Sequence, residues 1–98
     1  MREPIFSDDA QRQLAGLRVY DQRKVIEAIR AQLINADPQQ ESRNKFRLRR
    51  ASKYADYELR IGDPRTFCRV LPDGMVYIAL IGVKQGNKLI INGEEFQL

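Results

Sequence analysis

The N-terminal part of the chain places apolar side chains at the spacing of a helix. Residues 3–7, EPIFS, are a short apolar start that predicts a strand ended by Ser7. From there to residue 17, apolar positions recur every three or four residues, and Ser7 or Asp8 can cap the helix that this period predicts. Acidic side chains in its first turn suit the positive end of the helix dipole. The apolar face of this helix consists of Ala10, Leu14 and Leu17.

A second and longer helical pattern covers residues 19–38. Asp21 is a suitable N-terminal cap for it, and Pro38 marks its end. The apolar stripe that follows the helical period consists of Val25, Ile26, Ile29 and Leu33. Together, the two segments predict a helical hairpin with one apolar side.

The second half of the chain changes to the alternation that is typical of β-strands. Turns are predicted at GDP (residues 62–64), at PDG (residues 72–74) and at Asn92-Gly93, a common hairpin pair. Strands are expected over residues 45–50, 57–61, 65–71 and 75–83, and the tail adds further apolar pieces. The strand over residues 75–83 is the most apolar, so we expect it at the centre of the sheet.

This order of elements predicts a single α+β domain. With 98 residues, the chain has room for one hydrophobic core. An N-terminal strand and a helical hairpin come before three or four antiparallel strands. We therefore expect the helices to pack on one face of a small antiparallel sheet. The other face of the sheet would then stay open.

An open face accounts for the arginines around the GDP turn. Alternation along residues 57–61 divides the side chains between two faces. One face holds Tyr57, Leu59 and Ile61, and the other holds Asp56, Glu58 and Arg60. By the same alternation, Phe46 and Leu48 share one face of the strand before it. We expect Arg60, Arg65 and Arg69 to line an exposed concave surface instead of a core.

The composition excludes several kinds of site. The chain has no histidine, which excludes Ser-His-Asp and Cys-His catalysis. No cluster of cysteines or carboxylates has the spacing of a metal site, so we expect neither a metal nor a cofactor. The single cysteine, Cys68, cannot form an internal disulfide, and we expect it to be buried in a strand. No apolar run is long enough for a membrane span or a signal peptide, so we expect a cytoplasmic protein with no membrane partner.

Basic charge is concentrated in the central half of the chain. Residues 43–88 hold eleven basic and four acidic side chains, whereas residues 1–42 hold six and seven. Such asymmetry suggests a polyanionic partner such as nucleic acid. The stretch RNKFRLRRASK contains no acid and six basic side chains: Arg43, Lys45, Arg47, Arg49, Arg50 and Lys53. This basic run is either a polyanion-binding surface, which we favour and which would bind RNA or an acidic protein segment, or a solvated strand face.

The tyrosines of this half also allow two interpretations. Tyr54, Tyr57 and Tyr77 could stack on the bases of a nucleic acid. Tyr57 and Tyr77 fit core positions of their strands better, so we expect these two in the core. The apolar tail around Leu89 and Phe96 either closes the core or docks a partner.

The most distinctive part of the sequence surrounds the GDP turn. A strand ends in Leu59-Arg60, the turn follows, and Arg65 opens the next strand. An apolar strand then closes with Gly82 and Lys84. In this order, after a helical hairpin, these features resemble the RelE/ParE superfamily, the toxins of bacterial type II toxin–antitoxin systems. The resemblance runs over nearly the whole chain.

The resemblance implies an activity. Toxins of the RelE branch enter the ribosomal decoding site and cut messenger RNA by attack of a ribose 2′-hydroxyl on the adjacent phosphate. This reaction needs a group that takes the hydroxyl proton, cations that stabilise the phosphorane, and a proton donor for the leaving oxygen. By this likeness Arg65 and Lys84 would be catalytic cations, and Arg60 would contribute to RNA binding. Without such a role, Arg65 would pair with Asp63 or Glu58 across the turn, and Lys84 would be a solvated lysine.

The sequence departs from RelE at two places. Asp56 and Glu58 stand where RelE has two lysines, and Ile90 stands where it has a C-terminal tyrosine. Other nuclease branches of the superfamily are thought to use a glutamate as the base, which makes Glu58 the candidate base here.

The resemblance also implies partners. A cognate antitoxin would neutralise the chain, and operator DNA would be bound only through the toxin–antitoxin complex. The ribosome and its mRNA would be the target of the RelE-like activity. Two alternatives stay open, namely a ParE-like poison of DNA gyrase and a binding module with neither activity.

Overall fold

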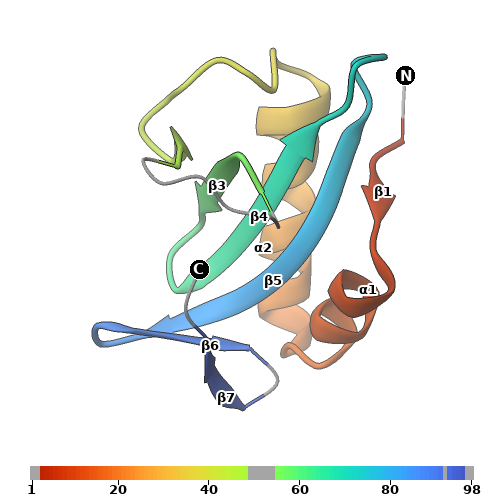
Figure 1. Cartoon of the computed structure of the whole chain (residues 1–98). Helices are drawn as coiled ribbons and strands as arrows, with labels where there is room; N and C mark the ends of the chain where they lie inside the picture. Colours follow the sequence, from red (N-terminus) through yellow and green to blue (C-terminus); the bar gives the residue numbers. More distant parts are fainter. Residues whose placement is uncertain (1–2, 49–54, 92, 97–98) are drawn as a thin grey trace.

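The chain folds as an α+β protein in which a helical hairpin precedes an antiparallel sheet (Figure 1). The computed structural model describes residues 3–48, 55–91 and 93–96. The elements are β1 (Ile5–Phe6), α1 (Asp8–Ala15), α2 (Val19–Ile29), a π-helical turn η1 (Arg30–Ile34), β2 (Lys45–Arg47), β3 (Tyr57–Arg60), β4 (Pro64–Val70), β5 (Val76–Gln85), β6 (Lys88–Ile91) and β7 (Glu94–Phe96). The predicted α+β class and the predicted order of helices and strands are confirmed.

β5 lies at the centre of the sheet, as its apolar sequence predicts. Within the described residues the strand order is β2-β3-β4-β5-β6-β7, and β1 pairs in parallel with the first half of β5. This sheet is larger than the three or four antiparallel strands that we expected. The C-terminal tail enlarges it by forming the β6–β7 hairpin, in which Leu89 lies opposite Phe96. The hairpin predicted at residues 92–93 is therefore present, although Asn92 lies outside the described residues.

The two helices begin in different ways. Of the two predicted caps, Ser7 is the one that caps α1, because its Oγ accepts a hydrogen bond from the Ala10 amide at 2.9 Å. The prediction that Asp21 caps the second helix is wrong, since α2 begins at Val19. The Asp21 carboxylate accepts instead from Nε of Arg18 at 3.2 Å, within the first turn. In the described part of the chain, neither helix combines the length and the apolar character that crossing a bilayer requires.

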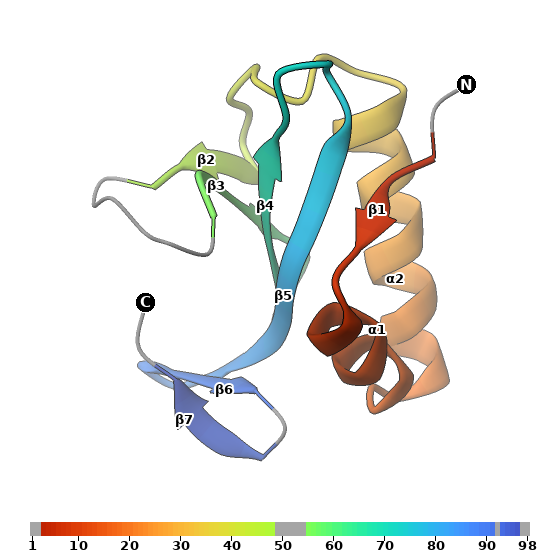
Figure 2. The same ribbon diagram turned by 45° about the vertical axis from the view of Figure 1, so that its right-hand side comes forward.

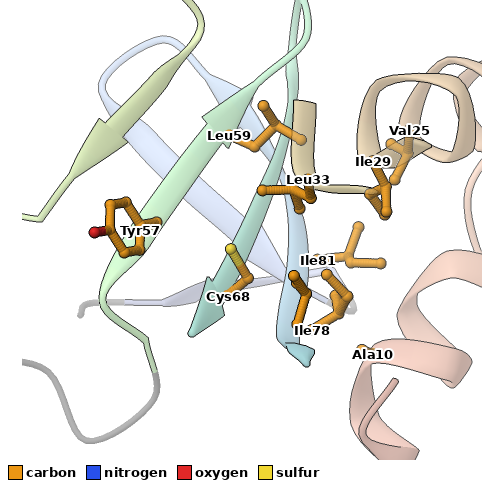
Figure 3. Close-up of a cluster of buried hydrophobic side chains, with 10 residues drawn as sticks. Ala10, Val25, Ile29, Leu33, Tyr57, Leu59, Cys68, Ile78 and Ile81 are labelled. Atoms are coloured by element: carbon orange, nitrogen blue, oxygen red, sulfur yellow. The ribbon is translucent and has the colours of Figure 1, made fainter. Parts of the chain in front are cut away.

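The helices cover one face of the sheet and bury the main core against it (Figures 2 and 3). The buried residues of this core are Ala10, Val25, Ile29, Leu33, Tyr57, Leu59, Cys68, Val76, Ile78 and Ile81. Tyr57 and Leu59 of β3 therefore point toward the helices, as their alternation predicts. Glu58 and Arg60 point the other way.

The opposite side of the sheet, which we call the open face, carries no helix of the described chain. β2, β3 and the β6–β7 hairpin extend toward this side, away from the helices (Figure 2). A second apolar cluster lies here, with Ala55, Phe67, Ala79, Leu80 and Ile91 buried in it. Half-buried Tyr77 packs against this cluster, so its ring belongs to the open face and not to the main core. Tyr57 is in the main core, as expected, and Tyr54 lies outside the described residues.

Cys68 is fully buried in the main core (Figure 3), which confirms the prediction from its strand position. Burial raises the pKa of the Cys68 thiol to about 12. We expect the thiol of the folded protein to react with a disulfide reagent at least about 10³-fold more slowly near pH 8 than an ordinary exposed thiol, because the thiolate is the nucleophile. The same reagent in denaturing urea is the control, and rapid labelling of the folded protein would contradict this burial.

Candidate functional site

A cleft of about 270 Å³ opens on the open face between the β3–β4 turn and the β6–β7 hairpin. Its lining is mainly polar and comes from β3, β4, β5, the β5–β6 turn and the β6–β7 hairpin. The lining residues are Glu58, Arg60, Arg65, Phe67, Lys84, Asn87, Lys88, Leu89, Glu95 and Phe96. The three residues predicted to be catalytic, Glu58, Arg65 and Lys84, therefore lie in one cleft although 26 positions separate the first from the last.

The carboxylate of Glu58 lies between two arginines. β3 and β4 pair so that Arg60 is directly opposite Arg65, and Glu58 is opposite Phe67. Oε2 of Glu58 accepts a hydrogen bond from Nε of Arg60 at 2.6 Å and lies 3.6 Å from Nε of Arg65. The side chains of Glu58 and Arg65 are 15% and 13% exposed, whereas that of Arg60 is 51% exposed. The pair of Glu58 and Arg65 is therefore held in the wall of the cleft, and Arg60, which binds the same carboxylate, is the more exposed of the two arginines.

The backbone of the GDP turn holds the guanidinium of Arg65. Nη1 of Arg65 donates to the carbonyl oxygens of Gly62, Asp63 and Pro64, the last two at 3.0 and 3.1 Å. Burial and the charge of Arg60 lower the pKa of Arg65, while Glu58 opposes this shift. Arg65 thus pairs across the turn with Glu58, and with the backbone rather than the carboxylate of Asp63. Anchored in this way, Arg65 is a preorganised cation at the edge of the cleft.

Lys84 reaches the same cleft from β5. Its backbone amide donates to the Asp63 carbonyl at 2.8 Å, which ties β5 to the GDP turn. Gly82, two residues earlier, lies opposite Arg65 in the sheet. A Cβ atom at Gly82 would lie 2.7 Å from Cγ1 of Ile91 and 2.9 Å from the carbonyl oxygen of Ile90. The glycine is therefore required for β6 to approach, and this approach places the hairpin wall beside Lys84.

The basic run predicted as an RNA-binding surface does not form the cleft. Arg43 and Arg47 are exposed and lie outside its lining, and Arg47 donates to the hydroxyl of Tyr57 on the helix side. Arg49, Arg50 and Lys53 lie outside the described residues. Among residues 43–48, therefore, no side chain adds charge to the cleft, and the cations there are Arg60, Arg65, Lys84 and Lys88.

The prediction that the basic run binds RNA is wrong for Lys45. Its side chain is only 1% exposed, so it cannot contact RNA from a surface. Its Nζ donates to the carbonyl oxygens of Gln32 and Asp37 at 2.6 and 2.7 Å. Burial lowers the pKa of Lys45, and the negative charge of Asp37 opposes that shift. Lys45 therefore joins the last turn of the helical segment, where backbone carbonyls lack helical partners, to the loop that follows it.

Replacing Lys45 with methionine is expected to lower the free energy of unfolding by about 2–4 kcal/mol, since two carbonyl groups then lose their donor inside the protein. Urea unfolding followed by circular dichroism measures this loss. Arg43→Met, an exposed substitution two residues away, is the matched control and should change stability by less than about 0.5 kcal/mol. Equal stability of the two variants would contradict the structural role of Lys45.

The two acids that replace the lysines of RelE are placed differently. Glu58 lines the cleft, whereas Asp56 is exposed and lies outside the lining. Of these two carboxylates, Glu58 is the one positioned to act on a bound ligand. In the residues that the structure describes, no group of three acidic or cysteine side chains is placed to hold a metal ion.

The β5–β6 turn and the β6–β7 hairpin contribute cleft residues that the sequence did not predict, namely Asn87, Lys88 and Glu95. Leu89 and Phe96 of the apolar tail line the cleft beside them and pack against the second apolar cluster. Nζ of Lys88 lies 4.0 Å from Oε2 of Glu95 across the hairpin. The Asn92-Gly93 turn was a usable signal for this pairing, because a hairpin there brings the residues on its two sides together.

Comparison with known protein families and with curated proteins gives no match for the sequence. The interpretation of the cleft therefore depends on its own residues.

Proposed function

We propose that this chain is the toxin of a bacterial type II toxin–antitoxin system and that it cleaves mRNA in the decoding site of the ribosome. The observation that carries the proposal is the meeting of Glu58, Arg65 and Lys84 in one cleft on the open face. A carboxylate beside several fixed cations is the set of groups that transesterification of RNA requires. The resemblance of the GDP turn and its flanking strands to the RelE/ParE superfamily supports the same conclusion.

In the proposed reaction, each catalytic residue has one role. Glu58 takes the proton of a ribose 2′-hydroxyl as its oxygen attacks the adjacent phosphorus. Arg65 binds the non-bridging oxygens of the phosphorane, for which its planar guanidinium is suited. Lys84 adds positive charge and gives a proton to the departing 5′-oxygen. The products are a 2′,3′-cyclic phosphate and a free 5′-hydroxyl, and the protons balance between Glu58 and Lys84.

The composition of the cleft favours the nuclease over the alternative of a gyrase poison. A protein that only blocks gyrase needs a surface that binds gyrase. It does not need a carboxylate held between two arginines. The largely buried pair of Glu58 and Arg65 is a feature that a reaction would use. A toxin of this kind would act in the cytoplasm, be neutralised by an antitoxin, and contact operator DNA only in complex with that antitoxin.

Expression of the chain in a bacterium tests the proposal. We expect growth to slow, and co-expression of the small gene encoded beside it to restore growth. Sequencing of RNA ends after induction should reveal new ends within translated codons. Intact messages with an induced DNA-damage response would indicate gyrase instead. Normal growth at verified high expression, with no new RNA ends, would contradict both toxin activities and leave a binding module as the remaining alternative.

A further inference from the structure

Arg60 is fixed from two sides on the open face. Its guanidinium carbon lies 4.8 Å from the centre of the Phe46 ring on the neighbouring strand β2, a cation–π contact. Its Nε donates to Oε2 of Glu58 at 2.6 Å. The hydrogen bond joins the side chain to the carboxylate that we propose as the base, and the ring of Phe46 holds the guanidinium in that place.

The two arginines contact the same oxygen of Glu58. Arg60 and Arg65 both approach Oε2, at 2.6 and 3.6 Å. Each carboxylate oxygen has two acceptor sites, and Arg60 occupies one of the two on Oε2, with the guanidinium of Arg65 beside it. This arrangement limits rotation of the carboxylate and favours Oε1, which neither of these two contacts occupies, as the oxygen that takes the proton of a 2′-hydroxyl.

We propose that Arg60, supported by the ring of Phe46, is a positioning residue that orients Glu58 for proton abstraction. This inference rests on the proposed nuclease function, and it assigns Arg60 a role through Glu58 instead of through the RNA phosphates. Phe46 supports Arg60 in this role, and its phenyl ring has no hydrogen-bond donor with which it could bind a phosphate itself. The effect of changing Phe46 therefore separates positioning from phosphate binding.

Single-turnover cleavage of a short mRNA bound to ribosomes with an empty decoding site tests the inference. The protein is in excess, and the maximal rate and the half-saturating concentration are measured for Arg60→Gln and Phe46→Leu. We expect the maximal rate to fall about tenfold for Arg60→Gln and about threefold for Phe46→Leu, because both act on the transition state through Glu58. The half-saturating concentration should change less than about twofold in both.

A double-mutant cycle gives the readout that a purely structural role would not produce. In a Glu58→Gln background, neither substitution should lower the rate further, since a positioning residue has no effect once the base is absent. A raised half-saturating concentration with an unchanged maximal rate would overturn the inference and make Arg60 a phosphate ligand. Additive losses in the cycle would overturn it as well.

Failure of the inference is distinct from failure of the proposed function. If the unmodified protein cleaves no ribosome-bound mRNA, the nuclease proposal is wrong and the role of Arg60 falls with it. If the unmodified protein cleaves and the variants change only binding, the nuclease proposal stands and the inference alone is wrong. Urea unfolding of each variant verifies that it is folded.

Discussion

Replacing Arg65 with alanine is expected to lower the rate of RNA cleavage by about 10²–10³-fold, the usual cost of removing one preorganised charge donor from a transition state. The structure gives the physical reason. Three carbonyl groups of the GDP turn hold Nη1 of Arg65, so the cation is in place before the substrate arrives. Cleavage of ribosome-bound mRNA and growth after induction both measure the effect, and we expect toxicity to be lost.

The fold of the Arg65→Ala variant needs its own measurement, because losing the charged donor of the turn should cost about 1.5–3 kcal/mol of stability. Arg69→Ala is the matched control, since Arg69 lies on the same strand outside the lining of the cleft. We expect it to matter much less for cleavage. A folded Arg65→Ala variant that stays fully toxic would contradict the phosphate site and favour a poison that acts by surface binding.

Replacing Glu58 with glutamine is expected to reduce cleavage by about 10²-fold or more, the contribution of a general base. Glutamine keeps the size of the side chain and an oxygen that can accept from Arg60, but its amide cannot take up the hydroxyl proton. RNA affinity should remain close to that of the unmodified protein. The rate at saturation and the half-saturating concentration of ribosomes measured together distinguish the two effects.

Glu95→Gln is the control for this substitution. Glu95 lines the same cleft, but its side chain is 48% exposed and its contact with Lys88 is 4.0 Å long. Exposed pairs of this kind contribute about 1 kcal/mol or less. If Glu58→Gln has an effect as small as Glu95→Gln, then Glu58 only pairs with its arginines and another group would have to be the base.

Local patterns along the chain were sufficient for much of the fold. The cap at Ser7 follows from a hydroxyl that precedes a helical period, which is a property of a few neighbouring residues. The division of β3 into a buried side with Tyr57 and Leu59 and an open side with Glu58 and Arg60 follows from strand alternation. The same alternation, with the short GDP turn, was enough to predict that Arg60 and Arg65 share a face.

Other features could not be predicted from local patterns, because they depend on how the elements pack together. Alternation divides the side chains of β2 between two faces, but it does not tell which face the helices cover. A lysine at residue 45 even indicates the wrong answer, because lysines are usually on the solvent side. Lys45 is buried because the last helical turn and the loop after it present the carbonyls of Gln32 and Asp37 to its ammonium group. In β5, Ile78 and Ile81 are three residues apart and still share the helix side, since the pairing shifts register between Phe67 and Cys68.

The cleft is also a feature that depends on packing and that the sequence alone did not predict. Its far wall depends on how closely β6 approaches Gly82 and on the direction in which the β6–β7 hairpin leaves the sheet (Figure 2). Alternation and turn signals are local, so they specify which residues share a face of one strand. Which side of that strand the helices cover, and which distant segment closes a cleft over it, depends on packing among elements far apart in the chain.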